Sequence, residues 1–97
     1  FNCAKEPEIT QLCEFLNSMG ANIKGIGTDS LIIEGANELN QADITVIPDR
    51  IEAGTFLMAG ALNGEIKINN VIPLHLEKVT NKLIETGCQI NINDDSI

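Results

Sequence analysis

Residues 46–64 read VIPDRIEAGTFLMAGALNG, and this stretch decides how the chain folds. A proline and three charged residues come first, and no charge then occurs over residues 53–64. The charged residues are Asp49, Arg50 and Glu52. This arrangement raises two questions: what the charged residues contact, and what covers the apolar residues that follow them.

Asp49 followed three residues later by Glu52 resembles a capping box, in which one carboxylate accepts hydrogen bonds from helix amides and the other reaches back. The pattern predicts a helix that runs to about Leu62. Because this helix has no polar face beyond its first turn, we expect it to be buried nearly all round. Gly54 and Gly60 would let other elements approach closely, at a cost in helix propensity.

The composition is that of one small acidic domain. The 97 residues include six Lys and Arg against 14 Asp and Glu, a net charge of −8, and 43% are hydrophobic. Nucleic acids require clustered basic residues and aromatic residues for stacking, whereas here the basic residues are scattered and aromatics make up 3%. No apolar run reaches the ~20 residues that span a bilayer. We expect a soluble protein that binds neither nucleic acid nor membrane.

The cysteines and the single histidine do not form a metal-binding pattern. Cys3, Cys13 and Cys88 lack CxxC spacing, and His75 stands alone, so we expect neither a metal nor another cofactor. Three thiols without a disulfide framework favour a reducing, cytoplasmic location. Cys13 and Cys88 are interpreted as buried small hydrophobes and His75 as a surface residue. Cys3 stays open as a nucleophile.

The rest of the chain alternates helices and strands. Apolar residues at helical spacing predict helices over residues 7–19 and 72–86, each followed by a glycine stop, Gly20 and Gly87. Short alternating runs predict strands, and these are residues 21–25, 30–35, 42–48, 64–71 and 88–92.

An internal repeat is visible. LCEFLNSMGANI…TDSL, residues 12–31, aligns with VTNKLIETGCQI…DDSI, residues 79–97, with one residue deleted in the turn. The first copy continues past Leu31 into a strand, whereas the second stops at Ile97. We therefore expect the chain to be a slice of a longer repeated protein.

The carboxylates at the two helix starts are the candidate site. Glu6 and Glu8 precede or open one helix, and Asp49 and Arg50 open another, at strand ends where α/β folds tend to bind ligands. The alternative explanation is that these carboxylates only cap the helices and complement the helix dipoles. Arg50 is not required for capping and could hold an anionic substrate group.

Four segments carry a family resemblance: IPDRIEAGTFL (47–57), CAKEPEI (3–9), LNSMGANIKGIGTDSLIIEG (16–35) and VIPLHLE (71–77). With them, essentially all 97 residues resemble the enolpyruvyl transferases that act on UDP-N-acetylglucosamine in peptidoglycan synthesis. The resemblance implies an α/β (α+β) fold, an inside-out α/β barrel of repeated helix-and-sheet units with buried helices. It also implies a larger enzyme of two globules, with residues 1–48 ending one, 49–97 starting the other and a crossing near Pro48.

The activity implied by the resemblance is transfer of enolpyruvyl from phosphoenolpyruvate to the 3-hydroxyl of UDP-N-acetylglucosamine. The implied positions of Glu6, Glu8, Asp49 and Arg50 line the cleft between the globules. The family's lysine-asparagine pair, loop cysteine and anion-binding arginines have no counterpart, so this segment holds no catalytic residue and should be inactive alone.

Two alternatives remain open, as does self-association. One is a segment of the sister enzyme that acts on shikimate 3-phosphate, and the other is a stand-alone αβ domain whose acidic surface binds a basic partner. A half-made repeat exposes a sheet edge and apolar helix faces, which favours self-association of the chain.

Overall fold

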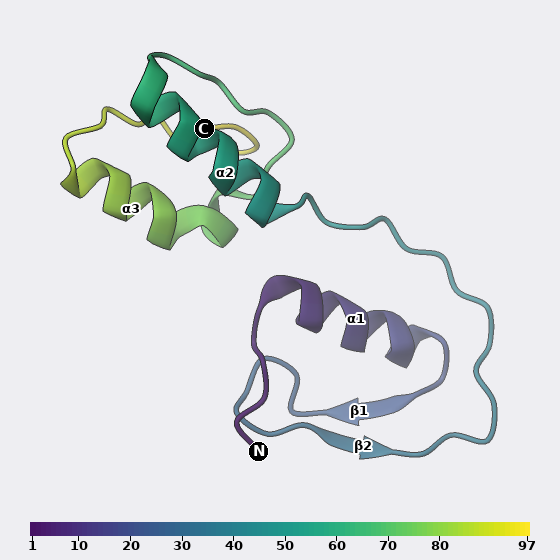
Figure 1. The fold of residues 1–97 in the computed structure, drawn as a ribbon. Helices are drawn as coiled ribbons and strands as arrows, with labels where there is room; N and C mark the ends of the chain where they lie inside the picture. The colour runs from purple at the N-terminus through teal and green to yellow at the C-terminus, as the bar shows by residue number, and fades with distance from the viewer. The chain divides into compact units, whose positions relative to one another are not determined.

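The computed structural model describes residues 1–97, except for the side chain of Asn63. The chain divides into two compact units, residues 1–47 and residues 48–97. Helices and a two-stranded sheet, drawn in Figure 1, make this an α+β protein. The larger barrel, and the assignment of residues 1–48 and 49–97 to two globules, stay predictions.

The first unit packs one helix on one hairpin. Helix α1 spans Pro7–Ser18, and the antiparallel strands β1 and β2 span Asn22–Lys24 and Ile32–Glu34. Pro7 stands at the first helical position, where its missing N–H is not needed. The side chain of Asn17 donates to the Ile23 carbonyl and accepts from the Ile23 N–H, both at 2.8 Å. This amide ties β1 to α1.

The strand predicted over residues 42–48 is not formed, and that prediction was wrong. Its backbone instead bonds to a side chain of α1: Gln11 Nε2 donates to the Thr45 carbonyl at 2.9 Å, and Ile47 N–H donates to Gln11 Oε1 at 3.1 Å. A strand requires a neighbouring strand, and here a glutamine amide takes that place.

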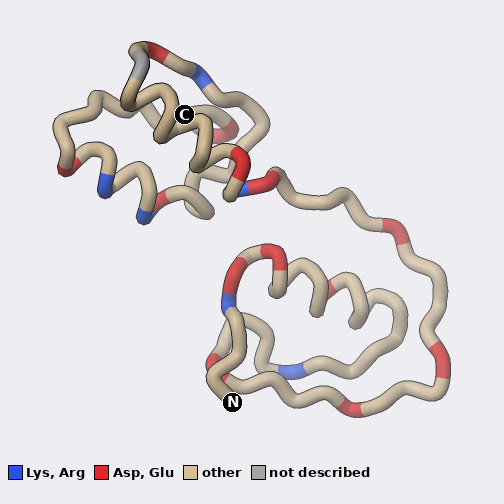
Figure 2. The backbone as a smooth tube through the Cα atoms, in the orientation of Figure 1, with Lys and Arg blue, Asp and Glu red and all other residues tan. Residues whose placement is uncertain are grey.

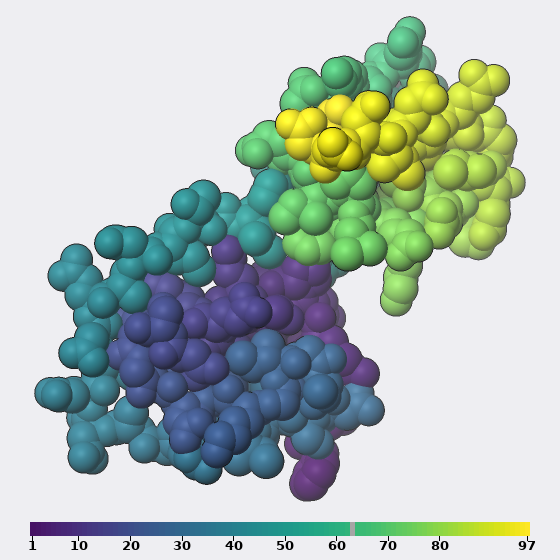
Figure 3. Space-filling model, turned by 180° about the vertical axis from the view of Figure 1, so that it is seen from behind, coloured from purple at the N-terminus to yellow at the C-terminus, as the bar shows by residue number. Residues whose placement is uncertain are grey.

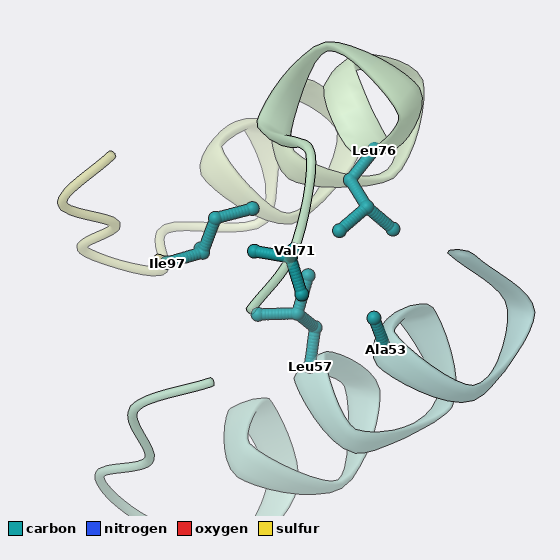
Figure 4. Packing of buried hydrophobic residues seen from close by; sticks show 5 residues of the cluster. All are labelled: Ala53, Leu57, Val71, Leu76 and Ile97. Carbon is teal, nitrogen blue, oxygen red and sulfur yellow. The ribbon is translucent and has the colours of Figure 1, made fainter. Parts of the chain in front are cut away.

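The second unit contains two helices joined by a short loop and a 3-10 turn. Helix α2 spans Arg50–Asn63, the 3-10 helix η1 spans Pro73–Leu76, and α3 follows directly over Glu77–Glu85. The core residues point toward one another in Figure 4, and they are Ala53, Leu57, Val71, Leu76 and Ile97. Figure 3 shows the C-terminal residues, in yellow, lying against the green part of the same unit.

Helix α2 is buried along one face only, which corrects the prediction that it is buried all round. Ala53, Gly54, Leu57 and Gly60 are buried, and their spacing places them on one side of the helix. The opposite side is apolar yet open to solvent, with exposed fractions of 61% for Ile51, 50% for Phe56, 53% for Met58 and 84% for Leu62. In the described chain of this unit, α3 and η1 pack against one face of α2 and leave the other uncovered.

The strands predicted over residues 64–71 and 88–92 are also absent. Between these parts of the second unit, a single bridge pairs Asn69 with Ser96, flanked by two backbone hydrogen bonds between Ile68 and Ile97 at 2.7 and 3.0 Å. Residues 88–92 lack a paired neighbour in the described chain.

The internal repeat is confirmed by matching backbone geometry at the ends of α1 and α3. Gly20 and Gly87 both adopt a left-handed conformation, with φ of 107° and 98°. The same four hydrogen bonds close each helix end, shifted by 67 positions. In the first copy they are Met19 N→Phe15 O, Met19 N→Leu16 O, Gly20 N→Asn17 O and Ala21 N→Leu16 O; in the second, Thr86 N→Lys82 O, Thr86 N→Leu83 O, Gly87 N→Ile84 O and Cys88 N→Leu83 O.

The similarity extends to the residues that precede each helix, beyond what the sequence alignment included. Asn2 and Asn70 have φ of 55° and 56°, and among the described residues they are the non-glycine positions with positive φ. The residue after each asparagine donates its N–H to an aspartate carbonyl at 3.1 Å, Cys3 to Asp29 and Val71 to Asp95. Asparagine is one of the few residues that adopt this conformation readily, so both copies use it at the same bend.

We predict that Asn70→Val lowers the free energy of unfolding by about 1–2 kcal/mol, because a left-handed backbone brings Cβ against the following carbonyl. Asn70→Gly should be neutral or stabilising. Urea denaturation of the chain measures both, with Asn69→Val as the control, since Asn69 has an ordinary φ. Equal losses for the two valine variants would show that the backbone conformation is not the cause.

The two buried glycines of α2 should respond in opposite directions to alanine. A Cβ at Gly54 would make ordinary contacts of 3.7 Å and 4.0 Å with Leu76 and Val79, so Gly54→Ala should stabilise by about 0.5–1 kcal/mol through helix propensity. A Cβ at Gly60 would overlap Ile66, so Gly60→Ala should destabilise by about 1–3 kcal/mol. Thermal unfolding of both variants checks this; a stabilising Gly60→Ala would mean that Ile66 is not held against the helix.

Candidate functional site

Asp49 caps the N-terminus of α2. Its backbone is extended, and its carboxylate oxygen Oδ1 accepts hydrogen bonds from the N–H groups of Ile51 at 2.8 Å and Glu52 at 3.0 Å. The predicted N-cap is therefore confirmed. The reciprocal bond of a capping box is not made in the described chain, since the Glu52 side chain does not reach the Asp49 N–H.

Three charged residues follow one another closely at this helix start, as the red and blue segments in Figure 2 show. Arg50 is the first residue of α2 and is half-buried, and Glu52 lies exposed in the first turn. Negative side chains complement the positive end of a helix dipole, whereas a guanidinium group does not. Capping and dipole effects therefore account for Asp49 and Glu52 and leave Arg50 unexplained.

The start of α1 differs from that of α2. Glu6 occupies the N-cap position, but its carboxylate makes no capping hydrogen bond; its backbone carbonyl accepts from Ile9 and Thr10 at 3.0 and 3.1 Å. Glu8 lies in the first turn, and both glutamates are exposed. Neighbouring Lys5 forms an ion pair with Asp29 of the turn after β1. Side-chain capping therefore does not explain Glu6.

The four predicted site residues fall into two pairs at two helix starts. Glu6 and Glu8 belong to the first unit, and Asp49 and Arg50 to the second. Each pair is brought together by its own helix. That the two pairs line a common cleft stays a prediction.

The structure confirms the predicted environment of Cys13 and corrects those of Cys88 and His75. Cys13 is buried, Cys3 and Cys88 are half-buried, and all three are free thiols. His75, interpreted as a surface residue, is instead half-buried, and its Nδ1 is buried without a hydrogen-bond partner among the described residues. The sequence did not show this, because His75 lies in the 3-10 turn η1, whose residues do not follow α-helical spacing.

The described residues contain neither a metal-binding cluster nor a membrane-spanning helix. No group of three or more His, Cys, Asp or Glu side chains there could hold a metal ion. No described helix combines the length and the apolar character needed to cross a bilayer.

A groove of about 890 Å³ in the second unit was missed by the sequence analysis. Its two sides are residues 64–67 and residues 86–91. Apolar residues from α2, α3 and the C-terminus complete the lining, among them Leu57, Leu83 and Ile97. The repeat offered a signal for it, since residues 89–91 correspond to β1, which is paired in the first copy and unpaired here.

Comparison with known proteins identifies the family. The profile of EPSP synthase (3-phosphoshikimate 1-carboxyvinyltransferase) matches residues 1–97. The chain belongs to the EPSP synthase family. The chain is also similar to curated proteins. The UDP-N-acetylglucosamine 1-carboxyvinyltransferase of Clostridium botulinum is 55% identical over 97 residues, and that of Helicobacter pylori is 54% identical over 99 residues. UDP-N-acetylglucosamine 1-carboxyvinyltransferase 2 of Bacillus anthracis is 55% identical over 97 residues.

These matches confirm the resemblance to enolpyruvyl transferases drawn from the sequence. Each covers 99% of this chain but only 23% or 24% of the relative. The chain therefore spans about a quarter of the length of these EPSP synthase family members. The names of these relatives describe complete enzymes, of which this chain matches one part.

Proposed function

We propose that the chain is a segment of an enzyme that transfers the enolpyruvyl group of phosphoenolpyruvate to the 3-hydroxyl of UDP-N-acetylglucosamine. The observation that carries this proposal is 55% identity, over 97 residues, to relatives named as UDP-N-acetylglucosamine 1-carboxyvinyltransferases. The proposal includes a role in peptidoglycan synthesis, and so in cell-wall formation, cell shape and division. The thiols without a disulfide framework support a cytoplasmic location.

The segment should contribute to this reaction without performing it alone. Stabilising two phosphorylated substrates requires several cationic groups directed at one place. Lys5, Lys24 and Lys82 form ion pairs with nearby carboxylates, those of Asp29, Glu34 and Glu85. The six basic residues are too few and too dispersed along the chain for such a site.

The charged start of α2 is proposed to face the substrate cleft of the complete enzyme. Arg50 is the residue that helix capping leaves unexplained, and its guanidinium suits an anionic substrate group. Asp49 holds the first turn of α2 in place, which fixes the position of Arg50 next to it. Glu6 and Glu8 are proposed as acidic residues of the same cleft.

The proposed fold of the complete enzyme is the inside-out barrel of two globules, with the crossing near Pro48. The apolar outer side of α2 supports buried helices there, because Phe56, Met58 and Leu62 would be covered by further units.

The apolar outer side of α2 also supports self-association of the isolated chain. Sedimentation at rising protein concentration measures the association. A chain that stays monomeric at every concentration would exclude it.

A sister activity is the second candidate. The matching family profile is described by 3-phosphoshikimate 1-carboxyvinyltransferase, a name that gives 3-phosphoshikimate as the acceptor. The three relatives described above, which match at 54–55% identity, are named for UDP-N-acetylglucosamine, and this favours that acceptor.

Phosphate release tests the proposal directly. The full-length enzyme that contains this segment should release phosphate from phosphoenolpyruvate with UDP-N-acetylglucosamine and not with shikimate 3-phosphate. The 97-residue chain should release none above the blank, because its cationic groups are too few. Turnover only with shikimate 3-phosphate would assign the sister activity, and turnover by the segment alone would contradict its supporting role.

Substitutions of Asp49 in the full-length enzyme separate capping from a cleft role. Asp49→Asn keeps a capping oxygen and loses the charge, so stability should change by less than about 0.5 kcal/mol. Asp49→Ala should cost about 1 kcal/mol of stability. Both should lower kcat by about tenfold or more, ~1.4 kcal/mol in activation free energy, if the carboxylate serves the cleft.

Thermal unfolding and steady-state kinetics on the same preparations provide the two measurements. Thr55→Ala is the matched control, since Thr55 lies further along α2 and its hydroxyl donates to the Ile51 carbonyl. Unchanged kcat in both Asp49 variants, with a lower melting temperature in Asp49→Ala alone, would reduce Asp49 to a helix cap.

A further inference from the structure

The segment over residues 41–47 is attached to the first unit by one side chain. Gln11, in the middle of α1, donates from Nε2 to the Thr45 carbonyl at 2.9 Å, and its Oε1 accepts from the Ile47 N–H at 3.1 Å. Within the described chain, residues 41–47 make no other hydrogen bond. A primary amide carries a donor and an acceptor side by side, so it can bind two backbone groups that flank one residue. Here that residue is Val46.

Burial contributes little to holding this segment in place. Ile44 and Val46 are 41% and 75% exposed, although both side chains are apolar. The nearest earlier attachment along the chain is the hydrogen bond from the Asn40 N–H to the Met19 carbonyl, at 2.7 Å. Without the amide of Gln11, the chain would therefore be bonded to the first unit only as far as Asn40.

The internal repeat shows that this attachment is not a feature of both copies. The shift of 67 positions that relates the two helix ends places Lys78 of α3 at the position of Gln11. Lys78 is exposed, and its ammonium group has three donors and no acceptor. It therefore cannot bind a carbonyl and an N–H together, as the amide of Gln11 does. The amide occurs in the copy that is followed by the charged start of α2.

The attachment lies directly before the boundary between the two units. Ile47 is the last residue of the first unit, and Asp49 is fixed to the second by its hydrogen bonds to the N-terminus of α2. Pro48 alone separates these two fixed residues. Its ring restricts its own φ, and it also keeps the preceding residue out of the helical conformation. The joint is thus short while Gln11 is bound, and it lengthens to residues 41–48 when that side chain is released.

We propose that Gln11 is a positioning residue for the charged start of α2: by binding the backbone on both sides of Val46, it limits the joint between the units to Pro48. This inference rests on the proposed function, in which Arg50 binds an anionic substrate group in the complete enzyme. A short joint restricts the positions that Arg50 can take, whereas a long joint makes the productive position rarer. Gln11 acts through the backbone and not by contact with substrate.

Amide hydrogen exchange of the 97-residue chain tests the attachment. After correction for sequence, the Ile47 N–H should exchange about fivefold more slowly than the Val46 N–H, since one hydrogen bond protects it. Gln11→Leu should remove this difference and keep the helix, because leucine favours helices. Gln41→Leu is the matched control, since Gln41 is exposed and makes no hydrogen bond in the described chain. Equal exchange at Ile47 in the wild-type chain and in Gln11→Leu would overturn the proposal.

Steady-state kinetics of the full-length enzyme test the positioning. Gln11→Leu should lower kcat/KM by about tenfold in the wild-type background and by less than about twofold in Arg50→Ala, because Gln11 acts through Arg50. Gln41→Leu should change kcat/KM in neither background. Unchanged kcat/KM in Gln11→Leu would overturn the proposal, as would an equal loss in both backgrounds, which a merely structural effect would give. The measurements use whichever acceptor the enzyme turns over, so activity with shikimate 3-phosphate alone would contradict the proposed function and leave this inference standing.

Discussion

The left-handed glycine after a helix is the constraint on which the rest of this structure depends. Gly20 and Gly87 reverse the chain at φ values that a side chain would disfavour, so the last helical carbonyls find N–H partners in the following residues. The next segment is thereby sent back along its own helix. In both units this reversal decides which residues lie against the helix and which stay open.

The same reversal has different consequences in the two units. In the first, β1 returns beside α1 and is completed by β2 and by the amide of Asn17. In the second, residues 89–91 return beside α3 and form one side of a groove. The position of Asn17 is taken there by Ile84, which cannot form the two amide bonds. The same left-handed glycine is thus followed by a paired strand in the first copy and by an unpaired segment in the second.

Sequence patterns predicted those features that depend on neighbouring residues along the chain. Helix starts at Pro7 and Asp49, glycine stops and the β1–β2 hairpin are all local, and all are present. The failures share another cause. Strands over 42–48, 64–71 and 88–92 require a partner strand, and the burial of α2 requires covering elements on both faces. Hydrophobic periodicity shows which side chains of a segment can be buried, but it does not show whether another element is present to cover them.

The candidate site was predictable in part for the same reason. The cap formed by Asp49 follows from local spacing, and so does the position of Arg50 beside it. The buried Nδ1 of His75 and the groove depend on contacts between distant segments, and neither left a clear pattern in the sequence. The repeat is the exception, because it lets one copy serve as a template for the other.

The two units bury very different amounts of apolar surface, which has a thermodynamic consequence. Cys13 and Ile23 are the buried apolar residues of the first unit, which relies on side-chain amides from Gln11 and Asn17. The second unit buries a connected aliphatic cluster around Leu57 and Leu76. Heat capacity of unfolding and sensitivity to denaturant both scale with exposed apolar area. The second unit therefore contributes more than the first to the heat capacity of unfolding.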